Sequence, residues 1–214
     1  GLRPLVANNK SATTTKLSRE HTVDRPAAGF VSIAGGKYTT YRVMAKDVVD
    51  RAVIELRRLT QESVTEKLPL VGADGYFALE QQKERLAQES GLDVETVTHL
   101  LNRHGSLISE ILEIIEEQPK LATKLDADLP YIKAEIVYAT SHEGARSVDD
   151  VISRRTRLSF EAVNHGVHLA DEIAALIGPV LGWSTKERKE SIAQYIELVE
   201  REITALDELL EVNS

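Results

Sequence analysis

The feature that most constrains the fold is a series of helix-patterned segments after residue 70, most of them bounded by glycine or proline. Apolar residues recur there at the three- and four-residue spacing of an amphipathic helix. Glycine ends helices because it adopts left-handed backbone conformations, and proline prevents a helix from continuing. The predicted segments are residues 78–90, 93–104, 106–118, 130–145, 147–158, 161–177 and 185–210. The sequence therefore predicts a mainly helical protein, with a helical bundle over residues 71–214.

The first sixty residues have a different pattern. Residues 16–23 and the β-branched run 30–34 predict two short strands, with a turn at 24–29 between them. Gly35 and Gly36 then end the second strand. Apolar residues at helical spacing follow and predict one long helix over about residues 39–59. This part of the chain is expected to form a small α/β piece, two strands plus a long helix, ahead of the helical bundle.

Charge and composition exclude several classes of function. The net charge is −8, but residues 1–60 carry eleven Lys or Arg against five Asp or Glu, a net of +6, which leaves −14 for the remainder. The acidic remainder disfavours nucleic-acid binding, because phosphate contacts need clustered cations. Cysteine is absent, which excludes disulfides, thiolate metal sites and cysteine nucleophiles. No run of 18 apolar residues and no basic-then-apolar leader is present, so a cytoplasmic protein is expected.

The stretch AGGKYTT, residues 34–40, joins the second strand to the long helix. It is not a Walker A loop, because Tyr38 follows the lysine where that loop needs Ser or Thr. N–H groups at a helix start attract negative charge, two glycines allow a ligand to approach the backbone, and Lys37 adds a full charge. Arg3 lies in a short stretch, residues 2–6, that is expected to be extended because the residue before Pro4 is pushed away from helix, and Arg19 lies in the first candidate strand. Arginine binds phosphate with two parallel hydrogen bonds. The pattern favours binding of a phosphate or of the electron-rich edge of a flavin. A plain turn with a capping threonine is the alternative.

Four tracts resemble one known family. GLRPL (1–5), SREHTV (18–23) and FVSIAGGKYTTYRVMAKDVVD (30–50), in this order, resemble the end of the flavin-binding region of FAD-dependent glycerol-3-phosphate dehydrogenases. LPYIKAEIVYATSHEGARSVDDVISRRTRL (129–158) resembles the helical carboxy-terminal domain of that family. The resemblance implies that residues 1–70 are the end piece of an FAD- and substrate-binding domain, and that residues 71–214 are an all-helical cap.

The resemblance also implies an activity and a set of site residues. The activity is oxidation of sn-glycerol 3-phosphate to dihydroxyacetone phosphate by hydride transfer to FAD, with electrons passing to a quinone or to oxygen. Arg3 and Arg19 are implied to bind the substrate phosphate, and Lys37 is implied to be the catalytic residue. Four residues are implied to offer main chain to the flavin: Gly35, Gly36, Tyr38 and Thr39.

The implied partners are an amino-terminal FAD domain, the substrate, and a quinone at the inner face of the cell membrane, where the protein would be peripheral. The family's dinucleotide fingerprint, GxGxxG, is expected upstream of Gly1. The chain by itself is therefore expected to be inactive and to bind FAD weakly or not at all. The rival interpretation is a helical protein-interaction module without catalytic activity.

The remaining motifs receive structural interpretations. His165 and His168 have a spacing that metal sites use, but no third ligand is evident, and no metal is predicted. Arg154, Arg155 and Arg157 could suit a nucleic-acid recognition helix, but ion pairs with nearby acidic residues are preferred, and no nucleic acid is expected. The apolar stripe of the last helix fits a bundle core, and a homodimer seam stays open.

Overall fold

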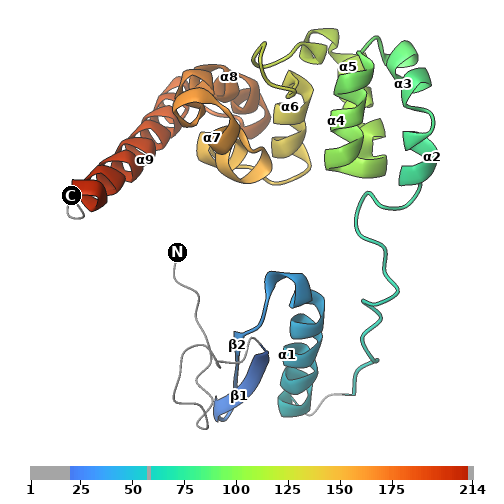
Figure 1. Ribbon diagram of the computed structural model, residues 1–214, viewed down its shortest axis with the longest axis vertical. Coiled ribbons are helices and arrows are strands. Elements are labelled where there is room, and N and C mark those ends of the chain that lie inside the picture. Colours follow the sequence, from blue (N-terminus) through green and yellow to red (C-terminus); the bar gives the residue numbers. More distant parts are fainter. Residues whose placement is uncertain (1–19, 57–58, 212–214) are drawn as a thin grey trace. The chain divides into compact units, whose positions relative to one another are not determined.

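The computed structural model of the chain describes residues 20–56 and 59–211, with side chains described as far as residue 205 (Figure 1). The chain divides into two compact units, Gly1–Pro69 and Leu70–Ser214. The first unit contains a two-stranded hairpin followed by a long helix, and the second is helical. The predicted fold class is therefore confirmed. Among the described helices, none has both the length and the apolar character needed to cross a membrane.

The hairpin of the first unit consists of the antiparallel strands β1 (His21–Ala27) and β2 (Phe30–Gly35). Its turn is only two residues long, Ala28 and Gly29, and Gly29 has a positive φ of 75°. The strand therefore continues through most of the segment that the sequence analysis assigned to a turn. The register pairs His21 with Gly35, so the start of β1 lies beside the end of β2.

A long helix follows the hairpin. A short 3-10 helix, Tyr38–Thr40, leads into α1 (Tyr41–Leu56), which packs against both strands (Figure 1). The prediction of one long helix in this region is confirmed, with somewhat tighter limits than expected. Since the helix starts only a few residues after β2, the glycine-rich turn between them is held between two regular elements.

Eight α-helices are described in the second unit. They are α2 (Tyr76–Glu80), α3 (Lys83–Ser90), α4 (Val94–His104), α5 (Ile108–Glu117), α6 (Lys133–Ser141), α7 (Leu158–Glu161), α8 (Ala170–Leu181) and α9 (Thr185–Glu211). Local signals fix several ends. Asp93 accepts a hydrogen bond from the Thr96 N–H at 2.7 Å and so caps α4, while Gly91 ends α3 in the left-handed conformation. Pro119 follows α5, which ends two residues earlier.

Two hydrophobic clusters fill the second unit, and α6 contributes to both. This helix lies between α5 and α8 (Figure 1). Ile132, Ala134 and Tyr138 pack with α4 and α5, whereas Ile136 and Ala139 pack with α8 and α9. A helix that buries residues on opposite faces joins the two halves of the unit. Among the described residues, every buried member of both clusters belongs to this unit.

Two predicted helices differ from the structure around residues 147–177. The segment 147–158 contains a π-helix, Asp150–Arg155, rather than an α-helix. Thr156 favours this wider turn, because its N–H donates to the Val151 carbonyl at 2.9 Å and its hydroxyl donates to the same oxygen at 2.7 Å. The predicted helix 161–177 is interrupted by a 3-10 segment, Val163–Leu169, before α8 begins.

The interruption contains three consecutive residues with left-handed backbone: Asn164 (φ 48°), His165 (φ 54°) and Gly166 (φ 72°). The Tyr195 hydroxyl donates to the His165 carbonyl, and His165 Nδ1 lies 3.0 Å from the Ser159 carbonyl. Burial raises the pKa of Tyr195 to about 12, so its hydroxyl keeps the proton that it donates. His165 and His168 therefore do not share one regular helix face, contrary to the expectation from their spacing.

Candidate functional site

The turn between β2 and α1 depends on its two glycines. Gly35 and Gly36 have φ values of 78° and 82°, a conformation that side chains disfavour. A Cβ added at Gly36 would lie 2.5 Å from Met44 Sδ and 3.3 Å from His21 Cβ. The positive φ values therefore favour glycine at both positions, and at Gly36 a side chain would also have to displace the end of Met44 and press on His21.

The residues after the glycines face outward. Lys37 and Thr39 are exposed, and Tyr38 is 93% exposed. The Thr40 hydroxyl donates to the Lys37 carbonyl at 3.0 Å and accepts from the Lys37 N–H at 3.4 Å, so Thr40 is the threonine that caps this end. The first N–H groups of a helix have no partner within it. Backbone donors and the Lys37 ammonium thus lie together on an open surface.

The structure brings together the predicted flavin contacts and the predicted catalytic lysine. Gly35, Gly36, Lys37, Tyr38 and Thr39 are consecutive in this turn, and within the described residues Lys37 has no ion-pair partner. Such a site suits an anion, because it offers hydrogen-bond donors and a positive charge.

The predicted phosphate ligands, Arg3 and Arg19, lie outside the described residues. The described part of the hairpin places His21 opposite Gly35, at the end that carries the turn. The assignment of both arginines to substrate phosphate stays a prediction.

Sequence reasoning missed an ion pair directly beside the turn. His21 Nε2 on β1 lies 2.7 Å from Asp47 Oδ2 on α1, and the histidine side chain is 19% exposed. The same two residues line a hollow of about 560 Å³, together with Val23, Asp50, Arg51 and Ile54. The two partners are 26 residues apart, so only the hairpin register and the packing of α1 could have revealed them.

The described residues of the first unit form no buried interior. Between residues 20 and 69, none of the described residues is buried. Seven large apolar side chains of its hairpin, turn and helix are exposed: Phe30, Tyr38, Tyr41, Val43, Val49, Ile54 and Leu56. Soluble domains seldom expose so many apolar side chains on so small a piece of chain, and such surfaces mark contacts with other protein. The exposed apolar side chains of this unit therefore suit packing against further protein within a larger domain.

The second unit contains a buried polar cluster around Glu135, whose residue is 2% exposed. Its carboxylate lies 3.1 Å from His99 Nε2 and 3.3 Å from His104 Nε2, and it accepts from the Ile132 N–H at 3.0 Å. Arg103 Nε lies 3.3 Å from the same carboxylate, without an aligned hydrogen bond. Burial alone would raise the pKa of Glu135, but hydrogen bonds from the two histidines lower it to about 2.

Histidines and arginines of this unit serve as structural contacts. His99 and His104 are hydrogen-bonded to Glu135, and within the described part of the chain no group of three His, Cys, Asp or Glu residues is arranged so that it could hold a metal ion. Arg154 is paired with Asp149 and Asp150. The preference for ion pairs over nucleic-acid contacts is thus consistent with the observed geometry of this arginine.

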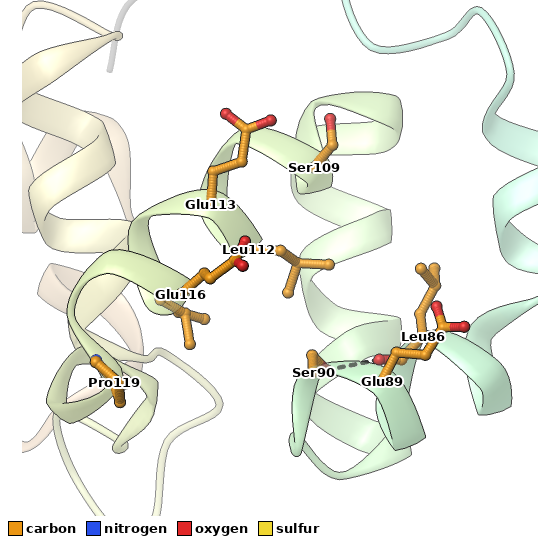
Figure 2. Close-up of a pocket in the computed structure, with 9 residues that line it drawn as sticks. Leu86, Glu89, Ser90, Ser109, Leu112, Glu113, Glu116 and Pro119 are labelled. Atoms are coloured by element: carbon orange, nitrogen blue, oxygen red, sulfur yellow. Dashed lines mark hydrogen bonds between the residues drawn. The ribbon is translucent and has the colours of Figure 1, made fainter.

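A groove of about 510 Å³ lies between α3 and α5 (Figure 2). Leu86 and Glu89 of α3 line one side, and Leu112 and Glu116 of α5 line the other. Glu113 adds a further carboxylate, and the lining contains no cationic residue. A phosphate ester would meet only negative charge and apolar surface here. The exposed turn of the first unit, and not this groove, is the candidate site for an anion.

Comparison with known proteins gives a match to one family model and to several relatives. Residues 63–188 match the sequence model of a family described as the C-terminal domain of alpha-glycerophosphate oxidase. Over 203 residues, 95% of the chain, the sequence is 47% identical to glycerol-3-phosphate dehydrogenase 2 of Mycobacterium tuberculosis (strain H37Rv), covering 34% of that protein. It is 37% identical over 196 residues, 90% of the chain, to the mitochondrial glycerol-3-phosphate dehydrogenase of Mus musculus, covering 26% of that protein. The chain thus spans about a third or less of the length of these relatives.

Proposed function

The chain belongs to the family of the C-terminal domain of alpha-glycerophosphate oxidase, and we propose that it is the carboxy-terminal part of a flavoenzyme. The parent protein, meaning the complete polypeptide that would contain this chain, would oxidise sn-glycerol 3-phosphate to dihydroxyacetone phosphate with FAD. Residues 1–70 would be the end piece of its FAD- and substrate-binding domain, and residues 71–214 its helical cap. Two relatives that align with at least 90% of the chain are named glycerol-3-phosphate dehydrogenases, which supports this assignment.

The open turn at residues 35–40 is the observation that carries the proposal. A flavin accumulates negative charge along its N1–C2=O edge when it is reduced, so its site needs donors and positive charge that are already in place. The turn offers the N–H groups of a helix start, two glycines that let a ring approach, and the exposed Lys37. These residues fit the flavin edge.

The lack of an interior in the first unit supports the same conclusion. Its exposed apolar side chains on β2 and α1 need a covering surface. In the parent protein, the missing part of the flavin domain would provide that surface. The isolated chain would then present only a fraction of the cofactor site, which explains why we expect it to be inactive.

When bound, FAD would accept the hydride from C2 of the substrate alcohol. The residues of this chain prepare the site for that transfer. Backbone N–H groups of Gly36, Tyr38 and Thr39 would donate toward the flavin edge, and Lys37 would add a fixed positive charge. Because these groups are in position before charge develops, they lower the barrier without a reorganisation cost. Arg3 and Arg19 would orient the substrate through its phosphate.

Addition of glycerol 3-phosphate to the purified parent protein without oxygen tests the function. We expect loss of the visible flavin absorption, and no loss with glycerol, which lacks the phosphate that the arginines would bind. Absence of FAD from the parent would contradict the cofactor assignment. Bound FAD that stays oxidised with the phosphate ester would contradict the substrate assignment. A helical interaction module without catalytic activity, the rival function, predicts neither FAD nor bleaching.

The electron acceptor and the location belong to the same proposal. A quinone at the inner face of the membrane would require the parent protein to be peripheral there, and oxygen would not. Reoxidation of the reduced parent by a soluble quinone analogue, compared with reoxidation by air, distinguishes the two acceptors.

A further inference from the structure

His21 and Asp47 lie immediately behind the turn that would face the flavin. His21 is paired with Gly35 across the hairpin, and its Cβ lies 3.3 Å from the position that a Cβ of Gly36 would occupy. Met44 fills the neighbouring space. The inner side of the turn therefore packs on the histidine, while Lys37 and Tyr38 face outward.

The ion pair fixes the histidine to the helix. His21 Nε2–H donates to Asp47 Oδ2 at 2.7 Å, and Asp47 lies on α1 less than two turns from its start. Two other charged residues line the same hollow. Asp50 is paired with Lys46 at 2.6 Å, and Arg51 is exposed. In the described part of this unit, Asp47 is thus the carboxylate that binds His21.

A second ion pair joins the same two elements at their other end. Arg25 Nε on β1 lies 2.6 Å from Glu55 Oε2 on α1. Arg25 is on the hairpin-loop side of β1, and Glu55 is near the last residue of α1. The strand and the helix are therefore connected twice, once beside the turn and once far from it. The Arg25–Glu55 pair, which is far from the turn, therefore serves as an internal control for the His21–Asp47 pair.

We propose that His21 and Asp47 are positioning residues, which hold the backbone N–H groups of Gly36, Tyr38 and Thr39 at the distance and angle that a reduced flavin requires. The expected effect on the flavin rests on the proposed function, whereas the expected effect on the order of the turn concerns only residues of this chain. The pair touches neither substrate nor cofactor. It acts through Gly35 and Gly36, whose packing against His21 sets where β2 ends relative to the first turn of α1.

Small displacements of such donors have large effects. A misplacement of about 1 Å can cost on the order of a hundredfold in rate, because preorganised donors stabilise charge only at short range. Loss of the tether would weaken the interaction with the reduced flavin more than that with the oxidised flavin, since only the reduced form carries the extra charge at that edge. The flavin would then become harder to reduce.

The first experiment uses the parent protein, in which the exposed apolar side chains of this unit would be covered, and it does not require bound FAD. Backbone ¹⁵N relaxation of wild type, His21→Leu, Asp47→Ala and Arg25→Leu reports the order of each amide. We expect order parameters of residues 36–40 to fall in His21→Leu and Asp47→Ala and to stay unchanged in Arg25→Leu. If His21→Leu does not fold, Asp47→Ala decides. Unchanged order in the folded variants, or an equal loss in Arg25→Leu, would overturn the proposal.

The second experiment uses the parent protein with bound FAD and measures the two-electron reduction potential. We expect His21→Leu to lose about tenfold in preference for reduced over oxidised flavin, which lowers the potential by ~30 mV. His21→Gln, which retains an N–H donor, should restore most of it, and Arg25→Leu should change stability only. A potential that does not move in His21→Leu would contradict the positioning role. Failure of wild type to bind FAD would instead contradict the proposed function and leave the relaxation result standing.

Discussion

At the scale of single residues, the buried carboxylate of Glu135 connects α4 to α6. It lies beside His99, Arg103 and His104 of α4, and it accepts the N–H of Ile132 at the start of its own helix. Its folded pKa is about 2, against an ordinary value of 4.5. Because the folded value is the lower one, the carboxylate stabilises the fold fully above pH 4.5, and this contribution is lost as the pH falls toward 2.

Replacement Glu135→Gln should therefore destabilise the chain by roughly 3 kcal/mol at pH 7, since it removes one side of a buried charge cluster. Urea unfolding followed by circular dichroism at pH 7 and pH 3 measures this. The difference between wild type and variant should be smaller at pH 3, because wild type has lost part of the same contribution there. Glu172→Gln, in the half-exposed pair with Lys133, is the control and should cost less than about 1 kcal/mol. An equal effect of both variants would contradict the role of Glu135.

Lys37 is the residue on which the proposed chemistry depends most. We expect Lys37→Ala in the parent protein to lower turnover at least tenfold while FAD content stays the same, because a lost positive donor weakens stabilisation of developing charge. Steady-state turnover and the flavin absorbance of the purified protein measure both quantities. Lys46→Ala is the control, since Lys46 is an α1 lysine already paired with Asp50. Turnover that is unchanged by Lys37→Ala would exclude Lys37 from catalysis.

At the scale of elements, the start or end of a helix was predicted best where a single neighbouring residue determines it. Asp93 at the start of α4, the glycine after α3 and the proline after α5 act on their nearest neighbours, so their effect is visible in the sequence. The break at Asn164–Gly166 could not be predicted from the sequence. It depends on Tyr195, which is 30 residues away and approaches only after α9 packs on the unit.

The functional turn shows the same limit. Gly35, Gly36 and Lys37 are adjacent in the sequence, and the need for positive φ and for a close approach can be predicted from their residue types. The His21–Asp47 pair could not be predicted, because it exists only through the hairpin register and the packing of α1. The residue types of the turn were enough to predict the candidate site, whereas the ion pair behind the turn is formed only in the tertiary structure.

The left-handed segment gives a prediction at this scale. Asn164 is exposed and has a φ of 48°, so its side chain can be removed without opening the core. Asn164→Gly should be more stable than Asn164→Ala by about 1 kcal/mol, because alanine pays the steric cost of left-handed backbone and glycine does not. Thermal unfolding of the two variants measures the difference. Equal stabilities would show that this backbone conformation is not maintained in solution.

At the scale of the whole molecule, the two units differ in how they are stabilised. Both hydrophobic clusters lie within residues 70–214, whereas residues 20–69 contain no buried residue where the structure describes them. Burial of apolar surface is the main favourable term in folding. The helical unit therefore has the means to fold alone, whereas the described residues of the hairpin unit provide no buried core.

Expression of residues 70–214 alone should yield a cooperatively folding helical protein whose thermal midpoint is within a few degrees of that of the whole chain. Residues 1–69 alone should show no cooperative transition and rapid proteolysis. Circular dichroism melts and limited trypsin digestion measure both. Loss of cooperative unfolding in the 70–214 fragment would mean that the hairpin unit contributes to its stability.

Because the described hydrophobic clusters lie within the helical unit, this unit should be exchangeable between related proteins. A recombination point between Pro69 and Leu70 cuts neither hydrophobic cluster, so helical units from the mycobacterial and mouse relatives could be exchanged there with few lost packing contacts. Differences in activity between such chimaeras would then come from the surface residues of the cap, because each exchanged unit would retain its own hydrophobic core. The experiment would therefore separate the residues that the cap uses for recognition from those that keep it folded.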